Sequence, residues 1–198
     1  DRQAIGSGWQ GHRVSAAHGG HVYTVVPDGR LLYYRYDGVT WTTQAREIGQ
    51  GWGGFRWVSV SRFGQIYALR EDYSLVVYVH DQSLGFYQSH TLSGAFDYPR
   101  IFAGGNNCIY AVNSAGQLLY WYHDDNYVWQ HQALPLGQGW GIFSSLASSG
   151  NGEIYGVRAS DGALVYYRHG GDRIVVNNGV GVVLTFGWAG LAVIAAGR

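Results

Sequence analysis

Hydrophobic and polar positions alternate along this chain in short runs rich in β-branched and aromatic residues, and Gly, Asp and Pro separate the runs. Runs of this length, bounded by turn residues, predict antiparallel strands joined as hairpins. In the first part of the chain the pattern predicts strands over 12–18, 21–26, 30–36 and 41–48. We find no segment with the 3.6-residue period of an amphipathic helix.

The same order of strands recurs along the chain, and each recurrence opens on an aliphatic residue followed by small or polar residues and an aromatic. These junction phrases are Ile5–Trp9, Ile48–Trp52, Leu92–Phe96, Leu136–Trp140 and Leu184–Trp188. They begin at residues 5, 48, 92, 136 and 184, so the periods are 43, 44, 44 and 48 residues. A period in this range indicates a repeat architecture.

Four antiparallel strands in each unit of about 44 residues are typical of a β-propeller blade. Side-chain size agrees with this interpretation, because the first strand is rich in small residues such as Ser15-Ala16-Ala17 and the third strand carries Tyr and Trp. Blades radiate from an axis, so inner strands are crowded and outer strands leave wider gaps to fill. We therefore predict an all-β fold, a β-propeller of four-stranded antiparallel blades with four complete repeats plus a partial fifth.

The whole chain, 1–198, is expected to form a single propeller domain. Its repeats run over 5–47, 48–91, 92–135 and 136–183, with a partial repeat over 184–198. Five first strands accompany only four complete sets of the other strands. The sequence does not decide among three ways of closing the ring. They are a four-bladed ring with an extra strand, a five-bladed ring with a defective blade, and a ring completed by another subunit in a homo-oligomer.

Composition narrows the function classes. The formal net charge is zero, with 13 basic and 13 acidic residues, whereas a nucleic-acid binder usually shows a basic stripe, so no nucleic-acid partner is expected. Cys108 is the only cysteine, which excludes an intrachain disulfide and a thiolate metal cluster. The most apolar stretch, 180–196, is interrupted by glycines and matches the repeat, so no membrane insertion is expected. The first residue is not Met, which suggests a processed N-terminus.

Three motifs together resemble the tachylectin family of β-propeller lectins over nearly the whole chain. They are the phrase Ile-Gly-x-Gly-Trp, the strand Ile-Tyr-Ala-Val and the segment Leu-Leu-Tyr-Tyr-Arg-Tyr-Asp-Gly. The resemblance implies binding of N-acetylated hexosamines, such as N-acetylglucosamine and N-acetylgalactosamine, at shallow equivalent sites near the blade junctions. It implies no catalysis and no metal, and we expect no cofactor. With the absent start Met, it also suggests a secreted protein.

Sugar binding needs an aromatic face for the apolar side of the ring and polar groups for the hydroxyls. The junction phrases supply Gly-Trp pairs, the third-strand ends supply Tyr, His and Asp, and two tryptophans open outer strands nearby. The predicted carbohydrate-binding residues are Gly8, Trp9, Tyr36, Asp37, Trp41, Gly51, Trp52, His80, Asp81, His123, Asp124, Trp129, Gly139 and Trp140. The third junction, with Ala95-Phe96, and the fifth, with Thr185, depart from the pattern and predict weaker sites.

Structural roles compete with these assignments. The junction tryptophans are more simply explained as plugs that bury apolar area between blades, and turn formation explains the Asp residues as well as ligand contact does. The histidines at 80, 123 and 169 occupy the same place in different blades, so they should lie apart rather than converge on a metal.

Sequence motifs argue against an enzyme. Segments 6–11 and 49–54 match G-x-G-x-x-G, but strands rather than helices follow them, which excludes the dinucleotide interpretation. Neither G-x-S-x-G nor H-E-x-x-H occurs. The second hypothesis is a protein-interaction propeller without sugar binding. Recurrence of the junction and strand-end residues favours several equivalent small-ligand sites over one docking face.

Overall fold

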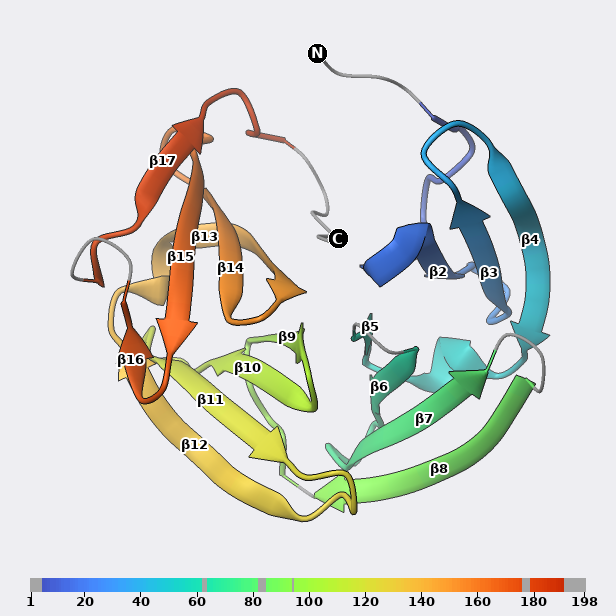
Figure 1. Ribbon diagram of the computed structural model, residues 1–198, viewed down its shortest axis with the longest axis horizontal. Coiled ribbons are helices and arrows are strands. Elements are labelled where there is room, and N and C mark those ends of the chain that lie inside the picture. Colours follow the sequence, from blue (N-terminus) through green and yellow to red (C-terminus); the bar gives the residue numbers. More distant parts are fainter. Residues whose placement is uncertain (1–4, 62–63, 82–84, 94, 176–178, 191–198) are drawn as a thin grey trace.

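The computed structural model describes residues 5–61, 64–81, 85–93, 95–175 and 179–190. Its strands form four antiparallel sheets, the blades, arranged around a common axis (Figure 1). Blade 1 holds β1 (Arg13–Ala17), β2 (His21–Val25), β3 (Leu31–Tyr36) and β4 (Trp41–Gly49). Blade 2 holds β5 (Trp57–Val60), β6 (Gln65–Leu69), β7 (Leu75–Asp81) and β8 (Gly85–Ser93).

Blade 3 holds β9 (Arg100–Gly105), β10 (Cys108–Val112), β11 (Leu118–His123) and β12 (Trp129–Gly137). Blade 4 holds β13 (Phe143–Gly150), β14 (Glu153–Arg158), β15 (Leu164–Gly170), β16 (Arg173–Ile174) and β17 (Val182–Thr185). The prediction of an all-β propeller with four-stranded antiparallel blades is confirmed, and the strands of blade 1 match the predicted ranges to within a residue or two. In the described ranges the helical segments are three 3₁₀ turns, η1 (His18–Gly20), η2 (Trp52–Gly54) and η3 (Trp140–Ile142).

Blade 4 ends differently from the other three. The short strand β16 follows β15, and the chain then returns as β17, which also pairs with β15. Leu164 lies opposite Thr185, as Leu31 lies opposite Gly49 in blade 1, so β17 takes the place of an outer strand. The first strand predicted for a fifth repeat falls largely in residues 191–198, outside the described residues. Figure 1 shows a gap in the ring between blades 4 and 1, with no described strand joining them.

The core of the protein lies between blades. Buried apolar side chains form three clusters, and each cluster joins strands of two neighbouring blades. Near the axis the first strands of neighbouring blades come into contact. There the Ser15 hydroxyl accepts a hydrogen bond from the Val60 N–H at 2.8 Å, and the Ser59 hydroxyl accepts one from the Ala103 N–H at 3.3 Å. This close approach explains the small residues of the inner strands.

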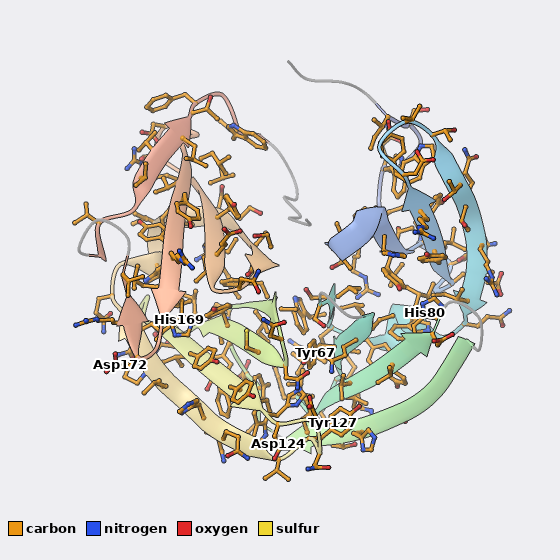
Figure 2. The ribbon with its side chains drawn as sticks, viewed as in Figure 1. Tyr67, His80, Asp124, Tyr127, His169 and Asp172 are labelled. Carbon is orange, nitrogen blue, oxygen red and sulfur yellow. The ribbon has the colours of Figure 1, made fainter. Side chains whose placement is uncertain are left out.

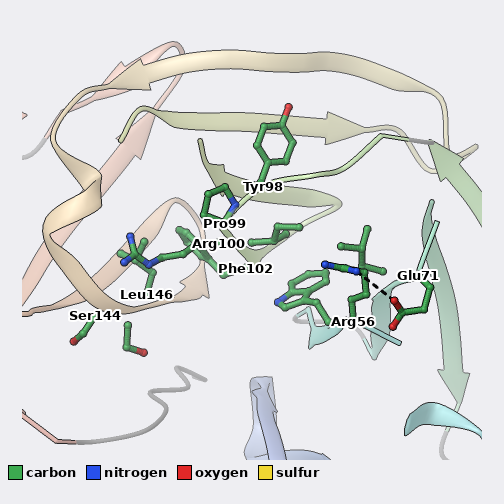
Figure 3. A pocket seen from close by; sticks show the side chains of 12 residues that line it. Arg56, Glu71, Tyr98, Pro99, Arg100, Phe102, Ser144 and Leu146 are labelled. Carbon is green, nitrogen blue, oxygen red and sulfur yellow. Dashed lines mark hydrogen bonds and ion pairs between the residues drawn. The ribbon is translucent and has the colours of Figure 1, made fainter. Parts of the chain in front are cut away.

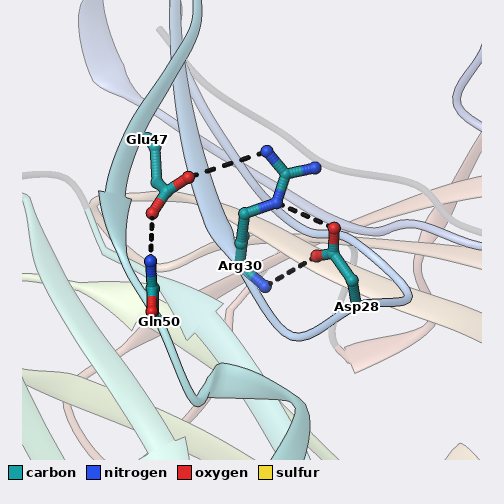
Figure 4. A network of polar contacts seen from close by, with 4 residues as sticks. All are labelled: Asp28, Arg30, Glu47 and Gln50. Atoms are coloured by element: carbon teal, nitrogen blue, oxygen red, sulfur yellow. Dashed lines mark hydrogen bonds and ion pairs between the residues drawn. The ribbon is translucent and has the colours of Figure 1, made fainter.

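An exposed polar network holds the turn between β2 and β3 against the outer strand of blade 1 (Figure 4). The Arg30 guanidinium lies 2.8 Å from the Asp28 carboxylate and 3.6 Å from that of Glu47, and the Gln50 amide donates to Glu47 at 2.8 Å. The Gly29 carbonyl, next to Asp28, accepts the Trp52 N–H at 2.8 Å. The network therefore supports the loop on which the second junction rests.

The residue before each junction aromatic adopts a left-handed backbone conformation. Its φ is 82° at Gly8, 77° at Gly51, 85° at Gly139 and 84° at Gly187, and Ala95 adopts 68° at the third junction. A Cβ is strained in this region, which is why glycine recurs there.

We therefore expect Ala95→Gly to raise the free energy of unfolding by about 1 kcal/mol, measured by urea denaturation. Ala115, an exposed turn residue that does not have a positive φ, provides the control. Ala115→Gly should not raise the free energy of unfolding. A urea concentration at the unfolding midpoint of Ala95→Gly that is equal to or below that of the parent protein would contradict backbone strain at Ala95.

Candidate functional site

Each blade junction is built on the same pair of aromatic rings. The junction aromatic packs against the ring of the third strand that follows it, with centroid separations of 4.7 Å for Trp9–Tyr34, 4.9 Å for Trp52–Tyr78, 4.5 Å for Phe96–Trp121 and 4.6 Å for Trp140–Tyr167. The backbone N–H of the junction aromatic also donates to the preceding blade, as in Trp52 to Gly29, Phe96 to Tyr73, Trp140 to Gly116 and Trp188 to Gly162. The second, third and fourth junctions thus each join two blades.

The second and fourth junctions are closed by their tryptophans. Trp52 is 5% exposed and Trp140 4% exposed, and each packs between two blades. Gly51 and Gly139, both predicted site residues, precede the turns η2 and η3 and supply the left-handed conformation that starts them. Packing between blades accounts for both tryptophan rings, and their part in sugar binding stays a prediction.

The first junction is open. It contains a pocket of about 270 Å³, here called the first-junction pocket, lined by Ile5, Gly6, Ser7, Gly8, Trp9, His12, Tyr34, Trp41 and Gln44. The Trp41 indole N–H donates to the Ile5 carbonyl at 2.7 Å, which holds the junction phrase against the outer strand. Trp9 is only half-buried, because no described blade precedes it as blade 1 precedes Trp52.

Three predicted site residues, Gly8, Trp9 and Trp41, meet in the first-junction pocket. The ring of a fourth, Tyr36, lies 5.2 Å from that of Trp41. Tyr34 was not among the predicted site residues, although its position in the third strand recurs as Tyr78, Trp121 and Tyr167. The polar lining residues His12 and Gln44 carried no recurring signal, because their counterparts in the other blades differ.

The third junction repeats this arrangement in closed form. The Trp129 indole N–H donates to the Leu92 carbonyl at 3.0 Å, as Trp41 donates to Ile5. Phe96 fills the junction and is 1% exposed. The rings of His90 and Tyr127 stack across the same boundary with centroids 3.9 Å apart. Trp129 therefore joins blades 2 and 3 at their periphery.

The predicted histidines lie between blades. A tyrosine on the second strand of one blade hydrogen-bonds the histidine at the end of the third strand of the next, at 2.9 Å in Tyr23–His80, Tyr67–His123 and Tyr110–His169 (Figure 2). His123 donates through Nδ1 to the Asp124 carbonyl at 2.8 Å, and its Nε2 lies 2.9 Å from the Tyr67 hydroxyl.

Burial of these histidines has two consequences. His80 is 5% exposed and His123 is fully buried, so neither ring reaches a bound sugar unless the blades separate. Burial also lowers the pKa of both imidazoles; for His80 the charge of Arg46 lowers it further. The structure does not bring these two predicted residues into the first-junction pocket.

The predicted aspartates serve the turns after the third strands. One Asp37 oxygen accepts the backbone N–H groups of Val39 and Thr40, both at 2.8 Å, and these bonds lower the pKa of Asp37. Asp124 accepts the N–H groups of Asn126 and Val128 at 2.9 Å. Asp81 is the last residue of β7. Turn formation thus accounts for Asp37 and Asp124, and a sugar contact by any of the three stays a prediction.

Within the described ranges, no three His, Cys, Asp or Glu side chains form a group that could hold a metal ion. No helix in the described part of the chain has the length and apolar character needed to span a membrane. Cys108 is buried, and desolvation raises the pKa of its thiol to about 12.

The fold and its aromatic junctions define a β-propeller built from repeated four-stranded blades. A family model described as Tachylectin matches residues 1–126 and 79–198, which together span the chain, so the chain belongs to the Tachylectin family. A search among curated proteins gave no match.

Solved structures with the same fold include one described as "The de novo evolutionary emergence of a symmetrical protein is shaped by folding constraints". It has a TM-score of 0.62 and 23% identity, covering 98% of this chain and 86% of that chain. The Aleuria aurantia lectin, described as a fungal lectin with a six-bladed β-propeller fold and a novel fucose recognition mode, has a TM-score of 0.52 and 17% identity. The match covers 89% of this chain and 66% of that lectin.

SapL1 lectin, solved in complex with α-methyl fucoside, has a TM-score of 0.51 and 18% identity, covering 87% of this chain and 63% of that lectin. The chain thus spans just under two thirds of the length of these two lectins. At these identities the likeness establishes the fold.

Proposed function

We propose that this protein is a non-catalytic lectin that binds N-acetylhexosamine-terminated glycans. The observation that carries the proposal is the first-junction pocket, where the faces of Trp9, Tyr34 and Trp41 stand beside polar groups in one small cavity. Membership of the Tachylectin family supports a carbohydrate ligand. The resemblance noted in the sequence supports N-acetylglucosamine or N-acetylgalactosamine as the sugar.

The chemistry of the pocket suits one sugar ring. Its 270 Å³ lies at the lower end of the range for small-molecule sites, about 300–1,000 Å³, which favours a monosaccharide unit. An aromatic face can cover the apolar side of a pyranose. The Gln44 amide and Ser7 hydroxyl can exchange hydrogen bonds with sugar hydroxyls, and the glycine-rich backbone at Gly6–Gly8 lies open to an acetamido group.

Multivalency sets the effective affinity. A single shallow site near millimolar affinity corresponds to only about 4 kcal/mol. Several sites on one rigid protein raise the avidity by roughly 10²–10⁴ when they engage a dense glycan surface together. A secreted protein that recognises glycans on cell surfaces is the role we propose.

The test is a glycan array at dense presentation, with free N-acetylglucosamine and free fucose as competitors. Fucose is the informative comparison because two lectins of the same fold are described with it. We expect binding to N-acetylhexosamine-terminated glycans that free N-acetylglucosamine abolishes and fucose does not. Competition by fucose alone would reassign the sugar. A blank array from folded protein would overturn the lectin proposal and favour the protein-interaction propeller.

The first-junction pocket is tested by substitution. Trp9→Ala should weaken glycan binding at least about tenfold, or about 1.4 kcal/mol, because it removes one of the two indole rings that line the pocket. Phe186, an exposed aromatic outside the pocket lining, provides the matched control, and Phe186→Ala should bind as the parent protein does. Equal binding by the parent protein and Trp9→Ala would show that this pocket is not a sugar site.

A further inference from the structure

A second and larger pocket lies on the inner side of the ring, away from the first junction (Figure 3). Its volume is about 740 Å³, and blades 2, 3 and 4 all contribute to its lining. Trp57, Ile101, Phe102 and Leu146 line both this pocket and a smaller one, of about 120 Å³, between the first strands. We call it the central pocket.

Two guanidinium groups from different blades line the central pocket. Arg56 of blade 2 lies 3.2 Å from the Glu71 carboxylate and covers the Tyr73 ring at 4.4 Å. Arg100 of blade 3 donates to the Gly141 carbonyl at 3.4 Å. Both arginines have more N–H donors than these contacts use. With Glu71 as the one carboxylate in the lining, the pocket carries one positive charge in excess.

The blade-2 side of the central pocket breaks the repeat, whereas Arg100 belongs to it. Strand pairing places Arg100 at the position of Arg13, whose guanidinium also donates to a backbone carbonyl of the next junction, that of Trp52. The same pairing places Arg56 at the position that His12 and Pro99 hold in blades 1 and 3. Glu71, the ion-pair partner of Arg56, lies in a turn where Tyr73 has a φ of 61° and the other blades have glycine. The Arg56–Glu71 pair is found once in the repeated fold and is not needed by the repeat, which points to one ligand rather than several equivalent ones.

We propose that the central pocket binds a single carboxylate-bearing saccharide, such as a uronic acid residue of a glycan. Guanidinium groups form charge-assisted, often bidentate hydrogen bonds with carboxylates. The Trp57 ring provides an apolar face for a pyranose, and the Ser144 side chain lines the same cavity. The proposal rests on the proposed function only in taking the ligand to be a saccharide, because its site and its chemistry differ from those of the first-junction pocket.

Glucuronate and glucose form the matched pair of probes, since they differ in the carboxylate alone. In NMR titrations of the full chain at low salt we expect shifts of the Trp57 indole signal with glucuronate and not with glucose. Acetate separates sugar recognition from binding of any carboxylate, and it should bind at least tenfold more weakly than glucuronate. Raising the salt concentration should weaken the glucuronate complex.

Four variants complete the test. Arg56→Gln and Arg100→Gln should each weaken glucuronate binding at least tenfold, whereas Arg70→Gln, an exposed arginine outside the pocket lining, should not change it. Glu71→Gln should strengthen binding severalfold, because it removes the carboxylate that competes for Arg56.

Equal binding of glucose and glucuronate, binding of acetate as tight as that of glucuronate, or unchanged binding by both pocket variants would overturn the proposal. Trp9→Ala should leave glucuronate binding intact, and the pocket variants should leave binding to neutral glycans intact. Failure of the central pocket is therefore distinguishable from failure of the first-junction pocket.

Discussion

Trp140→Ala is expected to lower the free energy of unfolding by about 3–5 kcal/mol, among the largest effects of any single substitution in this protein. The Trp140 ring is 4% exposed and lies against Phe143 and Tyr167, at centroid distances of 5.6 and 4.6 Å. Alanine leaves a cavity between blades 3 and 4, and neither blade can move to fill it without breaking hydrogen bonds between its own strands. Urea denaturation followed by tryptophan fluorescence and circular dichroism measures the loss.

Trp9→Ala is the matched comparison, because Trp9 holds the same place in the first repeat but is half-buried. It should cost less stability than Trp140→Ala while weakening glycan binding at least about tenfold. Trp140→Phe keeps the test decisive if the alanine variant does not fold, since Phe96 fills the third junction in this protein. A Trp140→Phe protein of unchanged stability that has lost glycan binding would show that Trp140 is a sugar ligand rather than a plug.

Acidification from pH 7.5 to 5 is expected to destabilise the protein through His80 and His123. Burial lowers the pKa of both imidazoles in the folded protein, while in the unfolded chain they return to about 6.5. Below pH 6.5 the unfolded chain therefore binds protons that the folded protein does not, so stability is full above about pH 6.5 and falls as the pH drops toward the folded pKa. The slope is at most about 1.4 kcal/mol per pH unit for each histidine.

Urea denaturation at several pH values between 7.5 and 5 measures this slope, in a window above the titration of most carboxylates. His123→Gln provides the control, because glutamine can still accept from Tyr67 but does not titrate. The variant should show a shallower pH dependence than the parent protein. A stability that is constant down to pH 5 would contradict the assignment of buried, neutral histidines.

The sequence predicted the fold well because its signals are local and repeated. Strand β4, for example, was expected over 41–48 and runs over Trp41–Gly49, since turn residues bound it on both sides. The end of blade 4 was harder to predict, because the segment after β15 matches no other repeat. Both β16 and β17 pair with β15. This pairing depends on which strand edge of blade 4 is available and not on the residues of β16 and β17 alone.

The candidate site was predicted only in part. Gly8, Trp9 and Trp41 do meet in one pocket. His80 and His123 looked like equivalent polar groups for a ligand, yet each accepts or shares a hydrogen bond with a tyrosine 57 or 56 residues earlier in the chain. Recurrence marks any residue that every blade needs, whether it binds a ligand or holds the blades together.

The amino-acid sequence by itself determined the strands, their order within a blade, the number of complete repeats and the aromatic residue at each junction, because hairpin pairing and turn conformation depend on neighbours along the chain. Only the tertiary structure decided which aromatic rings are buried plugs and which line a pocket. That distinction depends on whether another blade covers the junction: blade 1 covers Trp52, and no described blade covers Trp9. Contacts between blades join residues far apart in the sequence, such as Trp52 with Gly29 and Tyr23 with His80, and no local pattern encodes them.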